Sequence, residues 1–339
     1  MSKKIAINGF GRIGKTFLRT LLQDKKNELE VVAINLGPGN PELAAHLFKY
    51  DSIMGKYQGS IEYKSCKNKD YTGILKIDGF EIKILSELNP LKTNWKNLEI
   101  DWVVESSGAF TKREKSELHL KSGAKKVLIT APSTNEDITI IPGVNDNQYK
   151  PDKHFIISLG SCTSNCFAPI IKVLKENFTI LNGFMTTIHA YTNDQVLLDI
   201  EHKDPRRARA AALNMIPTKT GADKVIVKIY PDLEKKLKGQ AIRVPTPVVS
   251  LVDFTFTTDH ELTTEKINQT FKKYSQNELK GILEYCEEPL VSKDFEQNSH
   301  SCIIDSFLTQ SLGKISKVFG WYDNEFGYCC RLKDFLLHN

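Results

Sequence analysis

The sequence predicts an α/β protein, with a Rossmann-type, doubly wound parallel sheet domain joined to an α+β domain that has a mostly antiparallel sheet. Three observations predict this fold class. A chain of 339 residues exceeds the length at which one hydrophobic core usually stops growing, so two domains are expected. Short apolar runs alternate with helical apolar spacing up to about residue 160. Beyond about residue 180 the apolar runs lengthen, and fewer helices separate them.

The first element is a β-rich run at 3–8, followed at once by the motif GFGRIG at 9–14 and by helical apolar spacing over 13–23. Strand, tight turn and helix in this order are typical of dinucleotide-binding units. The glycines let the backbone approach a pyrophosphate, and the helix N-terminus offers it unpaired N–H groups. The cofactor-binding residues expected from this turn are Gly9, Gly11 and Gly14.

The second strand is expected at 29–35 and ends on Asn35. Such units normally carry an Asp or Glu for the adenosine ribose roughly 20 residues after the glycines. Here Asn35 is followed by Leu36-Gly37-Pro38-Gly39, and the carboxylate is absent. Backbone and water could hold the ribose beside Asn35, but the missing carboxylate also removes the charge that ordinarily rejects a 2′-phosphate.

The remaining elements follow the same two patterns. Further strands of the first domain are expected at 101–106, 125–131 and 154–159, with a helix at 112–122. The strand-like segments of the second domain are FMTTIHAY, IRVPTPVVSLVDFTFTT and KVFGWY, with a helix near 263–276.

Composition excludes several functional classes. The 46 basic and 41 acidic residues give a net charge of +5, and the basic ones are dispersed, which argues against a specific nucleic-acid partner. No apolar run approaches the roughly 18 residues that span a bilayer, and the N-terminus lacks a signal-peptide core. Seven cysteines lack the spacing of a disulfide scaffold or zinc site. We expect a cytoplasmic protein without membrane or metal.

The segment SLGSCTSNC at 158–166 is the densest cluster of small polar residues, and helical apolar spacing follows it. Cys162 is therefore expected at a helix N-terminus, where N–H groups and the helix dipole stabilise a thiolate and lower the thiol pKa. Cys166, one turn further, is interpreted as a packed core thiol. A thiolate nucleophile also needs a proton acceptor, and His189 follows on the next strand.

An anion-binding set lies around and after His189. Guanidinium groups bind phosphate bidentately, and Thr hydroxyls with a Gly backbone complete an oxyanion cradle. The set comprises Thr192, the run HKDPRRARAA with Arg206, Arg207 and Arg209, the turn Pro217–Gly221 with Thr220, and Arg243. Two phosphates could bind here. For Arg206 and Arg209, salt bridges at a subunit interface are the favoured alternative.

Together these features define a narrow chemistry. A thiohemiacetal on Cys162 positions an aldehyde hydrogen for hydride transfer to a nicotinamide, and the oxidation then yields a thioester. Inorganic phosphate in a second pocket would release an acyl phosphate.

At this point the sequence resembles phosphorylating glyceraldehyde-3-phosphate dehydrogenase over essentially its whole length. The motifs that carry the resemblance, in the family's order, are INGFGRIG, AHLFKYDS, SGAKKVLITAPS, GSCTSNC, TTIHAYTNDQ, HKDPRRARAAALNMIPTKTGA, IRVPTPVVSLVDFTF, LVSKDF and GWYDNEFGY. The resemblance implies oxidative phosphorylation of glyceraldehyde 3-phosphate with NAD as cofactor, and NADP is the alternative.

The resemblance also implies residue roles. Cys162 matches the nucleophile and His189 its base. Residues matching the substrate-phosphate site are Thr192, Arg207 and Arg243, and those matching the surroundings of attacking phosphate are Ser161, Thr163, Thr220 and Gly221. Residues matching cofactor contacts are Arg12, Ile13, Thr130 and Asn324.

Domain organisation and assembly are implied by the same likeness. The nucleotide-binding domain would cover 1–161 and be completed by a C-terminal helix at 326–339. The catalytic domain would cover 162–325, with an S-shaped loop at about 190–215 that reaches a neighbour's cofactor in a homotetramer.

Departures from the family pattern concentrate at the cofactor. The usual ribose Asp is missing at Leu36, Leu88 stands where an Arg is common, and Leu159 replaces an Asn. No Arg or Lys occurs in 36–45 to bind an extra phosphate. Glu201 in the S-shaped loop could supply the lost carboxylate in trans, so NAD is favoured over NADP.

Four rivals stay open. Two are enzymes on the same framework: an NADP-preferring gluconeogenic form and an erythrose-4-phosphate dehydrogenase. A Cys/His hydrolase would leave the glycine turn and the phosphate pockets unexplained. A binding protein on an inactive scaffold would not need intact Cys162, His189 and Arg243.

Overall fold

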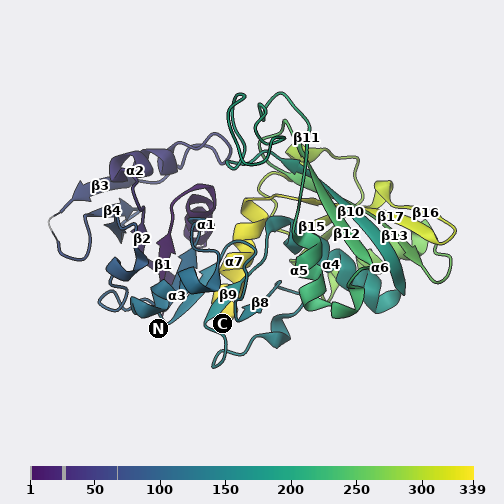
Figure 1. Ribbon diagram of the computed structural model, residues 1–339, viewed down its shortest axis with the longest axis horizontal. Coiled ribbons are helices and arrows are strands. Elements are labelled where there is room, and N and C mark those ends of the chain that lie inside the picture. Colours follow the sequence, from purple (N-terminus) through teal and green to yellow (C-terminus); the bar gives the residue numbers. More distant parts are fainter. Residues whose placement is uncertain (1, 25–27, 67) are drawn as a thin grey trace. The chain divides into compact units, whose positions relative to one another are not determined.

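The computed structural model describes residues 2–24, 28–66 and 68–339 and divides the chain into two compact units (Figure 1). The first unit consists of Met1–Ile140, Asn147–Gly160 and Leu332–Asn339, and the second of Ile141–Asp146 and Ser161–Arg331. Each unit has its own sheet. No helix in the described part of the chain is long and apolar enough to cross a membrane.

The first unit contains a nine-stranded sheet in the order β3-β4-β5-β2-β1-β6-β7-β9-β8. Its parallel strands are β1 (Lys3–Asn8), β2 (Leu29–Asn35), β6 (Trp102–Glu105), β7 (Lys126–Ile129), β8 (Ile138–Thr139) and β9 (Ile156–Ser158). The central strands are almost continuous runs of buried residues, as expected of a sheet covered on both faces. All the strands predicted for this domain are present.

Four strands and one α-helix among the described residues of this unit were not predicted, and one of the strands is the short β8. The strands β3 (Ile61–Ser65), β4 (Gly73–Ile77) and β5 (Phe80–Leu85) form an antiparallel meander, and β5 joins β2 in parallel. Helix α2 (Pro41–Lys49) begins where Asn40 accepts a hydrogen bond from the Leu43 amide at 3.0 Å. Helices α1 (Arg12–Leu22) and α3 (Arg113–Lys121) lie within a residue or two of the predicted bounds.

The second unit contains a sheet in the order β11-β12-β10-β13-β17-β15-β14, with β16 paired to β17. The strands are β10 (Ile180–Ala190), β11 (Ile216–Thr218), β12 (Leu237–Val244), β13 (Ser250–Thr258), β14 (Leu283–Cys286), β15 (Cys302–Asp305), β16 (Gln310–Leu312) and β17 (Ile315–Tyr322). Among the described strands of this second sheet, only β10·β12 and β14·β15 pair in parallel. The predicted fold class is therefore confirmed.

The predicted segment IRVPTPVVSLVDFTFTT is not one strand but two. It divides between β12 and β13 because Pro245 and Pro247 have no N–H to give to a ladder. Val249, just before β13, takes a φ of 67° in the connecting turn.

Helices α4 (Cys162–Asn177), α5 (Ala222–Ile229) and α6 (Thr264–Gln276) lie beside this sheet (Figure 1). They contribute Phe167, Ile226 and Phe271 to the same buried core as Phe254 of β13. Phe167 meets Phe254 edge-on, with ring centroids 4.9 Å apart. This core supports α4, whose first residue is Cys162.

The final helix, α7 (Phe326–His338), begins at a cap provided by Asp323, whose carboxylate accepts from the Phe326 amide at 2.8 Å. Its last part belongs to the first unit. There Phe335 packs edge-on against Trp102 at 5.8 Å, and Lys3 donates to the Leu336 carbonyl at 2.7 Å.

Candidate active site

Helix α4 begins where the sequence predicts it, because Ser161 and Ser164 cap each other. The Ser164 amide donates to Ser161 Oγ at 3.1 Å, and the Ser161 amide donates to Ser164 Oγ at 2.6 Å. This capping box satisfies two amides, those of Ser161 and Ser164, that the helix cannot pair internally. It fixes Cys162 in the first turn, where the positive end of the helix dipole acts on its sulfur.

Cys162 and His189 meet in the second unit. The Cys162 Sγ lies 3.5 Å from His189 Nε2, within hydrogen-bond reach for sulfur. His189 is the penultimate residue of β10 and is 4% exposed. A partly exposed thiol beside a buried imidazole is the nucleophile and base arrangement of covalent catalysis.

Arg243 lies directly behind His189 because β12 pairs with β10 in parallel and places these two residues in register. Its Nη1 is 2.7 Å from His189 Nδ1 and donates to the Ala190 carbonyl at 3.0 Å. The Arg243 Nε is buried and has no hydrogen-bond partner within the described residues. A buried charged donor of this kind is satisfied when an anion binds.

The protonation states of the pair follow from burial. Burial, followed by the positive charge of Arg243, lowers the pKa of His189 to about 3. Burial also raises the pKa of Cys162, against the opposing effects of Arg243 and of hydrogen bonds from Thr163. The expected lowering by the helix N-terminus is therefore wrong for the protein alone, since burial has the larger effect. The pair rests as a neutral thiol and a neutral imidazole.

Tyr322 is a site residue that sequence reasoning missed. Its hydroxyl bonds to Thr163 Oγ1 at 2.9 Å and to Thr187 Oγ1 at 2.7 Å, and its ring meets His189 edge-on at 6.0 Å. It thus ties the start of α4 to the strand that carries His189. Thr163 was predicted to lie beside the attacking phosphate, and its hydroxyl forms the hydrogen bond to Tyr322. The motif GWYDNEFGY contained Tyr322, but its position across the sheet depends on the β13·β17 register.

The loop after His189 carries a second missed residue, Asp194. Its carboxylate accepts from the hydroxyl of Thr192 and forms an ion pair with Arg207. Although burial acts to raise it, the Thr192 hydrogen bond and the charges of Arg243 and Arg207 lower the pKa of Asp194. Thr192 and Arg207, the two predicted phosphate ligands, therefore both contact the carboxylate of Asp194.

The other predicted anion ligands are placed separately. Thr220 and Gly221 lie at the start of α5, where Thr220 Oγ1 accepts from the Ala222 amide at 3.3 Å. Arg207 Nε also donates to Thr218 Oγ1 at 2.9 Å. Arg209 forms an ion pair with Asp199 of its own chain at 2.9 Å.

In the first unit, the glycine turn has the predicted shape. Gly9 has a φ of +91°, and a Cβ there would lie 2.4 Å from the Ser107 Cα. A Cβ on Gly14 would lie 2.3 Å from the Gly9 carbonyl oxygen. No side chain fits at either position, because Gly9 packs against the backbone of Ser107 and Gly14 against that of Gly9, so glycine permits the close packing of strand, turn and helix. Gly11 is the N-cap of α1 and has no side chain that could cover this helix end, where a pyrophosphate is usually bound.

A cavity of about 510 Å³ opens beside this turn. Its size and mixed lining suit an adenosine, for which such a pocket is the usual position. The lining residues come from the glycine turn, from the loop after β2 and from the ends of β5 and β6, and include Gly9, Gly11, Asn35, Leu36, Glu87 and Ser107.

The remaining predicted cofactor residues do not line this cavity. Arg12 forms an ion pair with Asp51 at 2.5 Å. Thr130 donates to the Glu105 carbonyl at 3.0 Å. Ile13 lies in α1, and Asn324, in the second unit, accepts from Ser250 Oγ at 3.1 Å.

Comparison with known proteins identifies the family. Family models described as the NAD binding domain and the C-terminal domain of glyceraldehyde 3-phosphate dehydrogenase match residues 3–113 and 161–324. The chain is 47% identical over 335 residues to glyceraldehyde-3-phosphate dehydrogenase 2 of Streptomyces avermitilis, covering 98% of this chain and 97% of that protein. It is 48% identical over 336 residues to the Geobacillus stearothermophilus glyceraldehyde-3-phosphate dehydrogenase, with coverage of 98% and 97%. The chain belongs to the glyceraldehyde-3-phosphate dehydrogenase family.

Membership of this family confirms the resemblance and the class of enzyme, an oxidoreductase. It also confirms NAD as the cofactor of the first unit, which is the family's NAD-binding domain. The cavity beside the glycine turn fits that cofactor, since its volume and mixed lining suit an adenosine and Gly11, at the start of α1, lines it without a side chain.

Proposed function

We propose that the protein oxidises D-glyceraldehyde 3-phosphate to 1,3-bisphosphoglycerate with NAD, through a thioester on Cys162. The observation that carries this proposal is the 3.5 Å approach of Cys162 Sγ to His189 Nε2 at the start of α4. The names of the relatives, all glyceraldehyde-3-phosphate dehydrogenases, support the substrate.

The reaction begins when the Cys162 sulfur adds to the aldehyde carbon and His189 Nε2 takes the thiol proton. The alkoxide oxygen of the thiohemiacetal is held by amides of the first turn of α4 and takes the proton from the His189 imidazolium, which returns His189 to its neutral form. His189 next removes the hydroxyl proton as the C–H hydride leaves, which yields the thioester. Bound NAD supplies the hydride acceptor.

Inorganic phosphate then attacks the thioester carbon, and Cys162 leaves as a thiolate that recovers its proton from His189. The acyl group is thereby released from Cys162 as the acyl phosphate product. We assign the attacking phosphate to Ser161, Thr163, Thr220 and Gly221, near the starts of α4 and α5. Two helix N-termini favour an anion.

The substrate's own phosphate is assigned to Thr192, Arg207 and Arg243. The buried, unpaired Nε of Arg243 supports this assignment, because an anion would satisfy it. An anion on Arg243 would also offset the positive charge that helps to lower the pKa of His189. Substrate binding would therefore make His189 a stronger base.

Initial rates with glyceraldehyde 3-phosphate and erythrose 4-phosphate, each with NAD or NADP and with or without inorganic phosphate, test this function. We expect the highest kcat/KM for the triose with NAD, and turnover that requires phosphate. Higher kcat/KM with NADP would support the gluconeogenic alternative, and higher kcat/KM with the tetrose would support the erythrose-4-phosphate alternative. Sustained turnover without phosphate would contradict the acyl-phosphate mechanism.

We also propose a homotetramer that works in the cytoplasm. The segment 190–215 exposes large apolar side chains, among them Leu197, Leu198 and Ile200, which are 79%, 69% and 66% exposed. Apolar groups exposed together mark an interaction surface. A nucleophilic thiol such as Cys162 works in a reducing compartment. Light scattering should give the mass of four chains, and the mass of one chain would contradict the assembly.

A further inference from the structure

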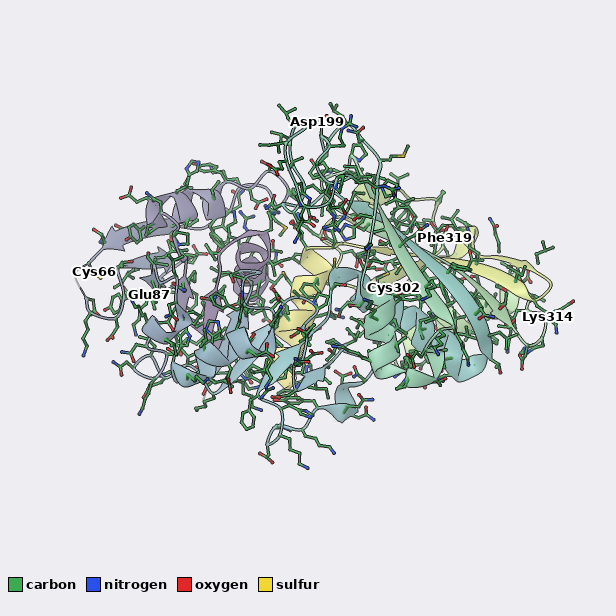
Figure 2. All side chains as sticks on the ribbon, viewed as in Figure 1. Cys66, Glu87, Asp199, Cys302, Lys314 and Phe319 are labelled. Carbon is green, nitrogen blue, oxygen red and sulfur yellow. The ribbon has the colours of Figure 1, made fainter. Side chains whose placement is uncertain are left out.

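The cavity beside the glycine turn holds one charged residue among the described residues that line it, and that residue is Glu87. The other lining residues are glycines, apolar side chains, amides and hydroxyls, including Leu36 and Leu88 at the positions where the chain departs from its family. Glu87 lies with the strands of the first unit (Figure 2).

The main chain of Glu87 is held rigidly. Its amide donates to Asn35 Oδ1 at 2.8 Å, and its carbonyl accepts from Asn35 Nδ2 at 2.8 Å. Asn35 Nδ2 donates also to Asn8 Oδ1 at 2.7 Å, and Asn8 donates to the buried Glu105 at 2.6 Å. Satisfied buried polar networks of this kind specify one arrangement.

The carboxylate of Glu87, in contrast to its main chain, has no interaction partner within the described residues. The side chain is half-buried, and within the described part of the chain it accepts no hydrogen bond and forms no ion pair. A half-buried acidic side chain without a partner, on a residue that lines a cavity, is available to a ligand with hydroxyl donors.

We propose that Glu87 binds the adenosine ribose diol of NAD and replaces the carboxylate that is missing after β2. Strand β5 lies beside β2 with Asn35 opposite Leu85, so a residue just beyond β5 reaches the same end of the sheet as Leu36. This inference rests on the proposed NAD-dependent function and names the residue that selects its cofactor.

Charge explains why this arrangement selects NAD. The 2′-hydroxyl can donate to Glu87, whereas a 2′-phosphate would place about −2 charges beside the carboxylate. No Lys or Arg is present among the described lining residues to offset that repulsion. The rival source of a carboxylate is Glu201, an exposed residue of the loop 190–215 that would have to act in trans.

Calorimetric binding of NAD, NADP and AMP to the full-length protein tests the proposal without a catalytic readout. We expect Glu87→Gln to weaken NAD and AMP binding about tenfold, the effect of one charge-assisted hydrogen bond, and to narrow the preference over NADP. The matched control is Glu81→Gln on β5, an exposed residue outside the cavity lining, which should bind as the wild type does. Glu201→Gln should also leave affinities unchanged.

A ligand change makes the same test without a variant. Wild-type protein should bind NAD that lacks the adenosine 2′-hydroxyl about tenfold more weakly than NAD. Equal affinity for the two, or wild-type affinity of Glu87→Gln, overturns the proposal, and so does a loss confined to Glu201→Gln. In each case intact turnover at saturating NAD would leave the proposed function standing.

Discussion

At the residue scale, the chemistry depends on how burial sets the protonation of two side chains. His189 and Cys162 are both neutral at rest, so the thiolate forms by proton transfer when the aldehyde arrives rather than standing as a permanent ion pair. The helix N-terminus still matters, because its amides face the charge that develops on sulfur and oxygen during the reaction.

Burial of His189 predicts a pH dependence of stability. Its pKa is 6.5 ordinarily and about 3 in the folded protein, so the unfolded chain binds more protons between these values. Stability is therefore complete above about pH 6.5 and falls as the pH drops toward 3, at about 1.4 kcal/mol per pH unit. His189→Asn removes this loss. Urea unfolding at pH 7 and pH 5 should show the variant losing about 2 kcal/mol less than wild type, whereas parallel losses would refute the assignment.

Asp194 predicts a change in anion affinity. Its carboxylate holds Thr192 and Arg207, the residues assigned to the substrate phosphate. Asp194→Asn removes the competing charge, and we expect two- to fivefold tighter binding of inorganic phosphate, about the value of a partly exposed ion pair. Calorimetric titration with phosphate measures this. Weaker binding would mean that Asp194 serves chiefly to orient Arg207. Asp199→Asn, which frees Arg209 instead, is the control.

At the element scale, the sequence predicted correctly those elements that are determined by interactions between residues close in the chain. The turn at Gly9–Gly14, helix α1 and the start of α4 follow from glycine conformation, apolar period and serine capping, all of which act within a few residues. In the meander β3–β5, the edge strand β3 alternates only weakly between partly buried and exposed residues, so its pattern in the sequence is faint. Tyr322 and Asp194 were missed because their roles depend on strand register and loop folding.

Strand β17 and helix α4 pack so closely that the contact permits only glycine. A Cβ on Gly320 would lie 2.8 Å from Cys302 Sγ, 3.0 Å from Ile170 Cδ1 and 3.2 Å from Cys166 Sγ. Gly320→Val should therefore lower the free energy of unfolding by about 1–3 kcal/mol through overpacking. Urea unfolding checks this. Adding Cys302→Ala should recover part of the loss, and strictly additive effects would contradict the contact.

At the scale of the whole molecule, the two units carry different parts of the function. The first holds the glycine turn and the cavity with Glu87, and the second holds Cys162, His189 and Arg243. Fold class and family were predictable from the order of motifs along the chain. The preference for NAD was predicted as well, but the residue that we propose to select the cofactor was not, because Glu87 lies about fifty residues from Leu36 and becomes its neighbour only through the β2·β5 pairing.

The central claim is that a thioester on Cys162 is resolved by phosphate. Rapid mixing of the enzyme and NAD with glyceraldehyde 3-phosphate, in the absence of inorganic phosphate, tests it most directly. We predict a burst of one reduced nicotinamide per active site, an acyl mass on the Cys162 peptide, and turnover that resumes when phosphate is added. Cys162→Ser should show no burst. A burst that persists in this variant, or steady turnover in the wild type before phosphate is added, would contradict the mechanism.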